Sequence, residues 1–289
     1  MTVEPAHQQI LAGAAATLSW QPTDSDGVAA APDGAVTVGI VRADGTVLVA
    51  AGAATGGTGT AARTYALTGA QTASLDLLTA TWTDSGGGAA VTTIAIVGGY
   101  YWSPSQARAV DESLADTSRY PDAALIRVRR QTEDEFETLC CVAFVPRYRW
   151  LWLNGTGRTD ILLPVRRPRI IRSARIYSDA TTYTAFTSTE LAALQTALSG
   201  VVTRRDGQIW PAGTLNIAVG VEHGHDRPPE DVRVASIRRA RQHLNTFRSS
   251  IPDGAERWTT PEGTIVCRVG DPDIDAVLAR HDLTTPGVA

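Results

Sequence analysis

The segment over residues 120–147, YPDAALIRVRRQTEDEFETLCCVAFVPR, constrains the fold more than any other part of the chain. Pro121 suits a first helical position, because its missing N–H would have no partner there. Pro146 disfavours helical backbone at Val145, so a helix must end before it. The sequence therefore predicts one long helix with a hard stop, whose apolar residues recur at helical spacing: Leu125, Val128, Phe136 and Leu139.

Charged residues of this predicted helix lie four positions apart. Arg129 precedes Glu133, and Arg130 precedes Asp134. We expect these pairs on the outer face, where each contributes only a few tenths of a kcal/mol. Nothing in the segment indicates catalysis, so we interpret it as a packing and interaction element.

Composition indicates a soluble globular protein with room for two domains. The chain has 289 residues, a hydrophobic fraction of 43% and a charged fraction of 19%. Its formal net charge is −4, and it contains arginine but no lysine. Only Arg42 and Arg63 precede residue 101, while later arginines are roughly balanced by acids. This balance argues against a general nucleic-acid binder, which normally has a clear basic excess.

The cysteines and the first residues bear on the cellular compartment. Cys140, Cys141 and Cys267 are odd in number and lack a framework spacing, so buried reduced thiols are expected. The start MTVEPAH has neither a basic nor an apolar signal region. No apolar run approaches the ~20 residues that span a bilayer. We expect a protein made in the cytoplasm that stays soluble.

Residues 1–100 are rich in Ala, Gly, Thr and Val, in short alternating segments separated by turn signals. Asp44-Gly45 predicts a two-residue hairpin in which both central residues have positive φ. The pattern predicts a small antiparallel β-sandwich, immunoglobulin-like in size, that decorates or binds. The expected strands cover residues 15–20, 36–42, 47–51, 64–67, 79–83 and 91–97.

After residue 100 the pattern changes to helices mixed with strands. Capping boxes begin two of the helices, from Ser103 to Gln106 and from Thr187 to Glu190. The predicted helices cover residues 104–117, 121–145, 188–198, 228–247 and 271–281, and the predicted strands 149–153, 160–165, 170–177, 182–186, 201–204 and 215–221. The predicted class is α+β with two domains. A sandwich over 1–100 precedes a helical domain over 101–282 with an inserted sheet and hairpin region, and residues 283–289 form an extended tail.

The sequence offers only a weak metal site. His223, His225 and Asp226 lie in the loop HGHD, and two histidines one residue apart can ligate a metal. No further ligands lie nearby, so histidines that hydrogen-bond the backbone are favoured instead. Residues 155–159, GTGRT, lack the lysine of a phosphate loop, and no serine elbow is present. We therefore predict that the protein is not an enzyme and binds no cofactor.

Arginine clusters and tryptophans remain open to two interpretations. The clusters are Arg166, Arg167 and Arg169 between strands, and Arg238, Arg239 and Arg241 on a helix. They form either solvated faces with local ion pairs or contacts to carboxylates of another subunit. Trp150 and Trp152 lie two apart and so share one face of their strand, as interface anchors or as core.

Four segments carry a family resemblance in their order along the chain. They are EDEFETLCCVAFVPR (133–147), ILLPVRRPRIIRSARIY (161–177), WPAGTLNIAVGVEHGHDRPPEDVRVASIRRARQHL (210–244) and DPDIDAVLARH (271–281). This ordered set resembles the head-to-tail connector (adaptor) proteins of long-tailed bacteriophages. It covers roughly the last two-thirds of the chain, and the N-terminal sandwich looks like an added decoration domain.

The resemblance implies a structural virion protein of the phage neck, assembled in the host cytoplasm. Such proteins form a homo-oligomeric ring, a dodecamer that matches the portal, between the portal protein and the next neck or tail component. Double-stranded DNA passes through the lumen during packaging and ejection, and no membrane is involved. The portal-docking tail would be Leu283, Thr284, Thr285, Pro286, Gly287, Val288 and Ala289. The subunit contacts would use Arg129, Arg130, Glu133, Asp134, Arg166, Arg167, Arg169, Arg238, Arg239 and Arg241.

Two alternatives belong to other functional classes. A monomeric or dimeric module that binds carbohydrate or a host would expose aromatic residues on the sandwich, where Trp20 and Trp82 are almost the only large ones. A metal-dependent hydrolase that uses His223 and His225 would retain a metal on purification.

Overall fold

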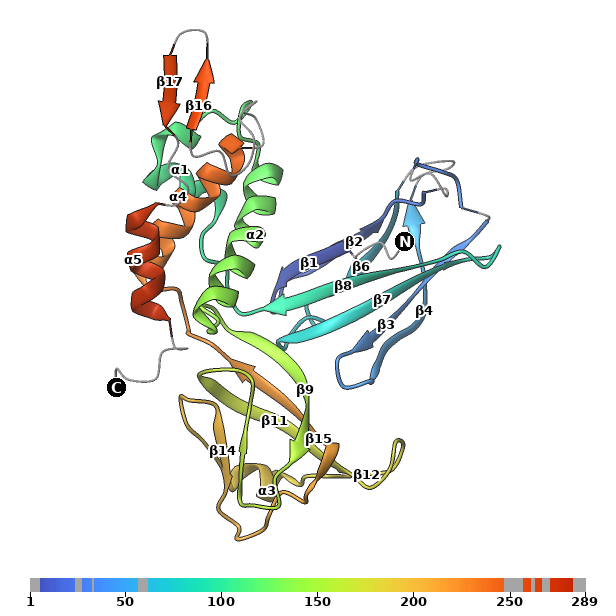
Figure 1. Cartoon of the computed structure of the whole chain (residues 1–289). Coiled ribbons are helices and arrows are strands. Elements are labelled where there is room, and N and C mark those ends of the chain that lie inside the picture. The colour runs from blue at the N-terminus through green and yellow to red at the C-terminus, as the bar shows by residue number, and fades with distance from the viewer. Residues whose placement is uncertain are drawn as a thin grey trace. The chain divides into compact units, whose positions relative to one another are not determined.

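The chain folds into two compact units in a computed structural model, and its class is α+β (Figure 1). The structure describes residues 6–23, 28–32, 34–56, 62–246, 257–260, 263–266 and 271–282. The first unit comprises Met1–Gly99 and Pro146–Gly224, and the second comprises Tyr100–Val145 and His225–Ala289.

The N-terminal part of the first unit contains two sheets. One has the order β1-β8-β7-β3-β4, in which β1 and β8 are parallel and the other neighbours antiparallel; the second has the order β2-β6-β5. The strands are β1 Ala6–Leu11, β2 Ala16–Trp20, β3 Val36–Arg42, β4 Val47–Ala53, β5 Thr55–Gly56, β6 Arg63–Leu67, β7 Asp76–Asp84 and β8 Ala89–Val97. Leu18, Ile40, Trp82 and Ile94 are fully buried in one core to which both sheets contribute. Alternating apolar residues thus bury one face of each sheet.

All six strands expected in this part are present, and β1 and β5 are additional. The hairpin at Asp44-Gly45 is also present, but only Gly45 has positive φ, at 87°. Asp44 instead accepts a hydrogen bond from the Thr46 N–H at 2.9 Å, so a local side-chain bond stabilises the turn. The immunoglobulin-like assignment stays a prediction.

The second part of the first unit contains two further sheets. One has the order β12-β11-β15-β9 and the other the order β10-β14-β13. Their strands are β9 Arg147–Gly155, β10 Asp160–Leu162, β11 Pro168–Tyr177, β12 Tyr183–Ala185, β13 Leu194–Thr196, β14 Val201–Arg204 and β15 Gly213–His223. Leu153, Ile161, Val202 and Ile217 share one core, where Trp210 is fully buried.

The predicted helix 188–198 is wrong beyond its first turns. Helix α3 covers only Ser188–Ala192, with the expected capping box of Thr187 and Glu190. Leu194 begins strand β13, which pairs with β14, and Leu198 is exposed. Gly200, at φ 93°, lies in the turn between these strands rather than at a helix end. The leucines at helical spacing therefore lie first in a helix and then in a strand. From Leu194 onward, the backbone N–H and C=O groups pair with β14 instead of continuing the helix.

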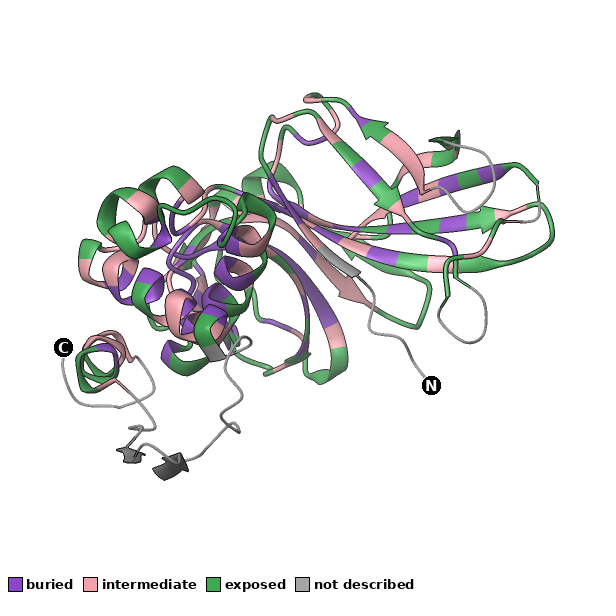
Figure 2. Ribbon diagram, turned by 90° about the horizontal axis from the view of Figure 1, so that it is seen from above, coloured by how far each residue is buried: buried purple, intermediate pink, exposed green. Residues whose placement is uncertain are grey.

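The second unit is built on helices that bury their facing sides (Figure 2). They are α1 Pro104–Val110, the 3₁₀ turn η1 Glu112–Leu114, α2 Asp122–Cys140, α4 Glu230–Thr246 and α5 Pro272–His281. Between α4 and α5 along the chain, strands β16 Arg257–Thr260 and β17 Gly263–Val266 form an antiparallel pair. Val128, Phe136, Ile237, Ala240 and Ile274 belong to one buried core. Phe247, the last residue of the predicted helix 228–247, lies outside the described residues.

Helix α2 confirms the long element but corrects its details. Pro121 is the residue before the first turn, and the helix ends at Cys140, five residues before Val145. Cys141 has left-handed backbone, at φ 52°. Leu139, expected in the apolar stripe, is 53% exposed, and Cys141 is exposed rather than a buried thiol. Cys267 lies outside the described residues.

Helix α1 is shorter than predicted for a local reason. Its capping box is present at Ser103 and Gln106, but the helix stops at Val110. The Asp111 carboxylate accepts hydrogen bonds from the N–H and hydroxyl of Ser113, at 3.1 and 2.6 Å, and so begins η1. None of the helices in the described ranges combines the length and apolar character needed to cross a membrane.

The inserted sheets differ from the expected grouping with residues 101–282. Segment Pro146–Gly224 belongs to the same unit as the N-terminal part. Strand β9 begins beside the end of β8, where the Gly98 N–H donates to the Pro146 carbonyl at 2.9 Å. A Cβ on Gly98 would lie 2.6 Å from Pro146 Cβ, so this close approach requires glycine. The division into domains over residues 1–100 and 101–282 stays a prediction.

Candidate interaction surfaces

The Arg129–Glu133 pair lies inside the second unit and not on an outer face. Arg129 Nε is 3.4 Å from Glu133 Oε1, and the side chains are 4% and 0% exposed. Glu133 Oε1 also accepts the Tyr101 N–H at 3.0 Å, while Arg129 donates to the Trp102 carbonyl at 3.1 Å. The pair therefore ties α2 to the segment before α1. Its placement corrects the expected exposure, because buried charges need this set of partners.

The other expected pair on α2 lies nearer the surface. Arg130 is half-buried and Asp134 is exposed. Their role in subunit contacts stays a prediction.

The arginines of α4 form ion pairs with acids of their own unit. Arg239 Nη2 is 2.6 Å from Glu135 Oε1, and Arg241 Nη1 is 2.8 Å from Asp111 Oδ2. The exposed Arg238 lies 3.4 Å from Asp273 Oδ2. Local ion pairs, one of the two interpretations left open by the sequence, are thus formed, and a role in subunit contacts stays a prediction for these arginines.

Glu135 is the centre of the contact between α2 and α4. His243 Nε2 lies 3.1 Å from its Oε2 atom, and Arg239 Nε donates to its Oε1 at 3.0 Å, so one carboxylate binds two side chains of α4. Burial raises the pKa of Glu135, but hydrogen bonds from His243 and Arg239 outweigh it and lower that pKa to about 2. The carboxylate therefore stays charged at neutral pH and holds the two helices together.

The proline-arginine turn lies between β10 and β11. Arg166 donates from its guanidinium to the Ser199 carbonyl. Arg167 has left-handed backbone, at φ 53°, and its carbonyl accepts the Gly224 N–H at 3.0 Å. Arg169 is exposed at the start of β11. The structure therefore separates this cluster, in the first unit, from the α4 arginines in the second.

One face of the four-stranded sheet carries aromatic rings with arginines stacked on them. Trp150 and Trp152 share this face, as predicted, opposite to the buried Leu151 and Leu153. The Arg172 guanidinium lies 4.7 Å from the Tyr148 ring centroid, and the Arg175 guanidinium lies 4.8 Å from that of Trp150. Stacked cations of this kind contribute on the order of 1 kcal/mol each.

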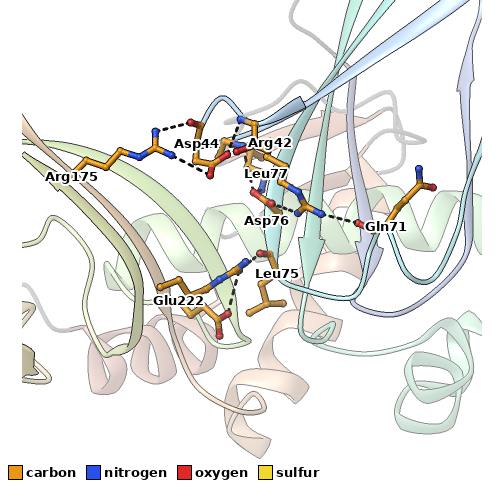
Figure 3. A network of polar contacts seen from close by, with 11 residues as sticks. Arg42, Asp44, Gln71, Leu75, Asp76, Leu77, Arg175 and Glu222 are labelled. Atoms are coloured by element: carbon orange, nitrogen blue, oxygen red, sulfur yellow. Dashed lines mark hydrogen bonds and ion pairs between the residues drawn. The ribbon is translucent and has the colours of Figure 1, made fainter. Parts of the chain in front are cut away.

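The same two arginines bind the N-terminal part of the first unit, and Figure 3 shows the contact of Arg175 with Asp44. Arg172 donates to the Leu75 carbonyl and lies 3.3 Å from Glu222 Oε1. Arg175 donates to the Asp44 carbonyl at 3.0 Å and lies 3.5 Å from its carboxylate.

The two loops that the arginines reach are fixed to each other by an ion pair. Arg42 Nη1 lies 2.5 Å from Asp76 Oδ2, next to the turn at Asp44 and the chain at Leu75 (Figure 3). The N-terminal sheets are therefore attached to the four-stranded sheet through side chains and not only by the polypeptide.

Sequence reasoning missed Arg172 and Arg175. Both lie on β11, where the pairing register with β15 shifts between Ile171 and Ser173. Their spacing of three therefore does not follow strand alternation. The only available signals were the arginines of β11 and the aromatic residues of β9, two strands that are separated in the sheet by β15.

The HGHD loop is divided between the units. His223 ends β15 in the first unit, is 5% exposed, and neither ring nitrogen has a hydrogen-bond partner. Burial and the nearby Arg149 and Arg147 lower the pKa of His223 to about 4. His225 belongs to the second unit and stacks on Phe144 at 5.6 Å. Within the described ranges, no group of three or more His, Cys, Asp or Glu residues could hold a metal ion.

The expected portal-docking tail, residues 283–289, lies outside the described residues. The helix before it is well anchored. Ile274 is buried, and Val277 and Leu278 pack against the core of the second unit.

Comparisons with known proteins give no family for the chain. No protein family matches it. No curated protein matches it either. Among solved structures, a chain from the neck of an empty GTA particle, computed with C6 symmetry, is similar with a TM-score of 0.43 and 15% identity, over 64% of this chain and 91% of that one.

Two further chains are similar at about the same level. One is from the virion of a native gene transfer agent (GTA) particle, with a TM-score of 0.42 and 17% identity over 57% of this chain and 79% of that one. The other is from the neck of a native GTA particle computed with C12 symmetry, with a TM-score of 0.42 and 16% identity over 60% and 88%. Likeness at this level establishes neither a shared fold nor a shared function.

Proposed function

We propose that this chain is a structural subunit of a phage neck, a head-to-tail connector that forms a ring between portal and tail. The ring is a homo-oligomer, a dodecamer, and double-stranded DNA passes through its lumen. The N-terminal sheets decorate it, and residues 283–289 dock into the portal. The protein acts by assembly, without catalysis or a cofactor.

The core of the second unit carries this proposal. Three segments with the connector resemblance, far apart in the sequence, supply α2, α4 and α5, and all three helices contribute to one core. Phe136 and Cys140 come from the first segment, Val232 and Ile237 from the second and Ile274 from the third. A chance succession of similar segments would not be expected to pack together.

Charge supports the proposed passage of DNA. Arginines of α4 and α5 are paired with acids of the same unit, such as Arg239 with Glu135 and Arg280 with Asp231. A surface balanced in this way neutralises few phosphates, and binding through phosphates is what makes DNA binding tight. Balanced pairs thus suit a channel through which DNA moves.

The decisive experiment is cryo-electron microscopy of the neck in purified particles that contain this protein. We expect a closed ring of copies at the portal exit, with the second unit in the ring wall. Mass photometry of the chain with and without its portal protein gives the matched solution measurement. Absence of the protein from particles, or a chain that stays monomeric with portal present, would overturn the proposal.

A further inference from the structure

The arginine-bearing face of the four-stranded sheet repeats one set of groups along β9. Each set has an aromatic ring from β9, a guanidinium stacked on it and a carboxylate beside the guanidinium. Tyr148 has Arg172 and Glu222. Trp150, two residues on, has Arg175 and Asp44. Both sets are completed from within the chain.

The next aromatic residue on this face, Trp152, has no such cation. Its ring lies 4.8 Å from that of Tyr177, which follows Arg175 by two residues on β11. Asp179 lies in the bend just after the end of the same strand. No guanidinium in the described part of the chain lies over Trp152 or pairs with Asp179. The third set thus has its rings and its acid but lacks the arginine.

A cavity lies where that arginine is missing. Its volume is about 290 Å³, and its lining includes Trp152, Tyr177, Asp179, Thr214, Leu215 and Asn216. Asp179 is the only charged residue of the lining. Trp152 is 48% exposed, so part of its ring surface is available to a partner.

The backbone at this cavity is strained. Leu215 has φ 48°, uncommon for a residue other than glycine, and its N–H donates to Asn154 Oδ1 at 2.7 Å. The register of β15 and β9 shifts between Gly213 and Ile217. Such bulges re-aim side chains beside functional sites, and strained residues persist where the surroundings impose them.

The free polar groups favour a cation over a hydroxyl-rich ligand. Asn216 is used internally, since Oδ1 accepts the Gly155 N–H and Nδ2 donates to the Pro211 carbonyl. Asp179 Oδ1 accepts the N–H groups of Thr181 and Thr182. These hydrogen bonds lower the pKa of Asp179 to about 2, which keeps the carboxylate charged at neutral pH. Aromatic faces next to a carboxylate attract a guanidinium.

We propose that this cavity binds an arginine side chain from a second copy of this chain, an inference that rests on the proposed ring. Every cationic side chain of the sequence other than histidine is an arginine, so the permanently charged side chains that a neighbouring copy can offer are guanidinium groups. The exposed Arg127, Arg158 and Arg227 have no acid partner among the described contacts. A planar guanidinium stacks on Trp152 and presents its N–H groups to Asp179, as Arg175 does with Trp150 and Asp44.

Binding is tested first with arginine amide as the probe. Titration into the full chain is followed by NMR of the tryptophan indole N–H signals, with Trp152→Phe assigning the relevant one. We expect a saturable shift that Trp152→Ala and Asp179→Asn each weaken about tenfold, and little effect of the neutral citrulline amide. Asparagine keeps the Oδ1 acceptor of the turn and removes only the charge.

Asp116→Asn provides the matched control. Asp116 Oδ1 accepts the N–H groups of Ser118 and Arg119 in a similar turn, and Asp116 is not among the residues that line this cavity. This variant is expected to bind the probe as the unmodified chain does. Equal shifts with citrulline amide, or unchanged binding by Asp179→Asn, would overturn the inference.

Assembly is tested by charge reversal. Asp179→Arg is expected to prevent ring formation, and one of Arg127→Asp, Arg158→Asp or Arg227→Asp is expected to restore it in the double variant. A ring that forms unchanged in Asp179→Arg, or one that none of the three restores, would overturn the second copy as the occupant and leave the proposed function standing. A chain that binds the amide but never assembles would overturn the proposed function and this occupant together.

Discussion

His223 is a buried histidine whose environment opposes its charged form. It is 5% exposed, lacks hydrogen-bond partners on both ring nitrogens and lies near Arg147 and Arg149. Its folded-state pKa of about 4 is below the usual 6.5, so the unfolded chain takes up the proton first. The contribution to stability is therefore complete above pH 6.5 and falls by about 3 kcal/mol as the pH drops to 4.

We predict that His223→Leu removes this loss. Hydrogen exchange of the β15 amides, measured at pH 7 and pH 4.5, reports the local free energy of opening. The unmodified chain should lose protection at the lower pH, whereas the variant should keep it. Arg149→Gln is the graded control, because it removes one of the nearby charges and should reduce the loss partially. Equal losses in all three chains would assign the acid sensitivity to other groups.

Glu133 gives a second prediction, for the second unit. Glu133→Ala leaves the Arg129 guanidinium buried without its carboxylate, and we expect a loss of about 3–5 kcal/mol. Glu133→Gln should cost less, because the amide oxygen can still accept the Tyr101 N–H. Replacing both residues, Arg129→Met with Glu133→Leu, should recover most of the loss. The free energy of unfolding of each variant is measured by urea denaturation, with hydrogen exchange of the α2 amides as the probe. A double variant as unstable as Glu133→Ala would contradict this explanation.

The end of helix α2 gives a prediction for an element. Cys141 follows the last turn with φ 52° and ψ 27°, a conformation that glycine adopts without the strain of a Cβ. Cys141→Gly should stabilise the second unit by about 0.5–1 kcal/mol, since relief of strain outweighs the added freedom of the unfolded chain. The urea midpoint tests this, with Cys141→Ala as the control. A gain in the alanine variant as large as in the glycine variant would point to removal of the thiol.

Where elements begin was easier to predict than where they end. Ser103, Thr187 and Asp271 begin helices through side-chain hydrogen bonds with residues two or three positions away, so their signals are local. The end of α3 depends instead on pairing between β13 and β14, and the early end of α2 depends on the left-handed Cys141. Periodicity over residues 188–198 could not distinguish a longer helix from a helix followed by a strand.

The surfaces were predictable only where strand alternation held. Trp150 and Trp152 share a face as their spacing requires. Arg172 and Arg175 escaped prediction because a register shift lies beside them, and Asp44 lies 131 residues from Arg175. Arg129 and Glu133 have the spacing of an exposed pair, but the partners that stabilise them inside the unit come from residues 101 and 102. Such long-range pairings are a property of the fold and not of local sequence.

At the scale of the whole molecule, the chain crosses between its two units more than once. The N-terminal sheets and the inserted sheets form one unit, and the helices on either side of the insertion form the other. Side-chain contacts of Arg172 and Arg175 support this grouping within the first unit. The proposed decoration and the proposed ring contact at Trp152 therefore belong to one body, while the segments with the connector resemblance in α2, α4 and α5 belong to the other.

The proposed portal contact gives the prediction for the whole molecule. A chain ending at Asp282 should keep the fold of the second unit, because Ile274, Val277 and Leu278 anchor α5 before the removed residues. It should nevertheless lose portal binding at least tenfold, since an extended tail gains its contacts only on binding. Mass photometry with purified portal protein measures the complex, and thermal unfolding checks the fold. The matched control carries residues 283–289 in scrambled order, and it should bind as weakly as the truncated chain. Full binding by the truncated chain would exclude the tail as the docking element, and the search for that contact would then move to the described surfaces of the second unit.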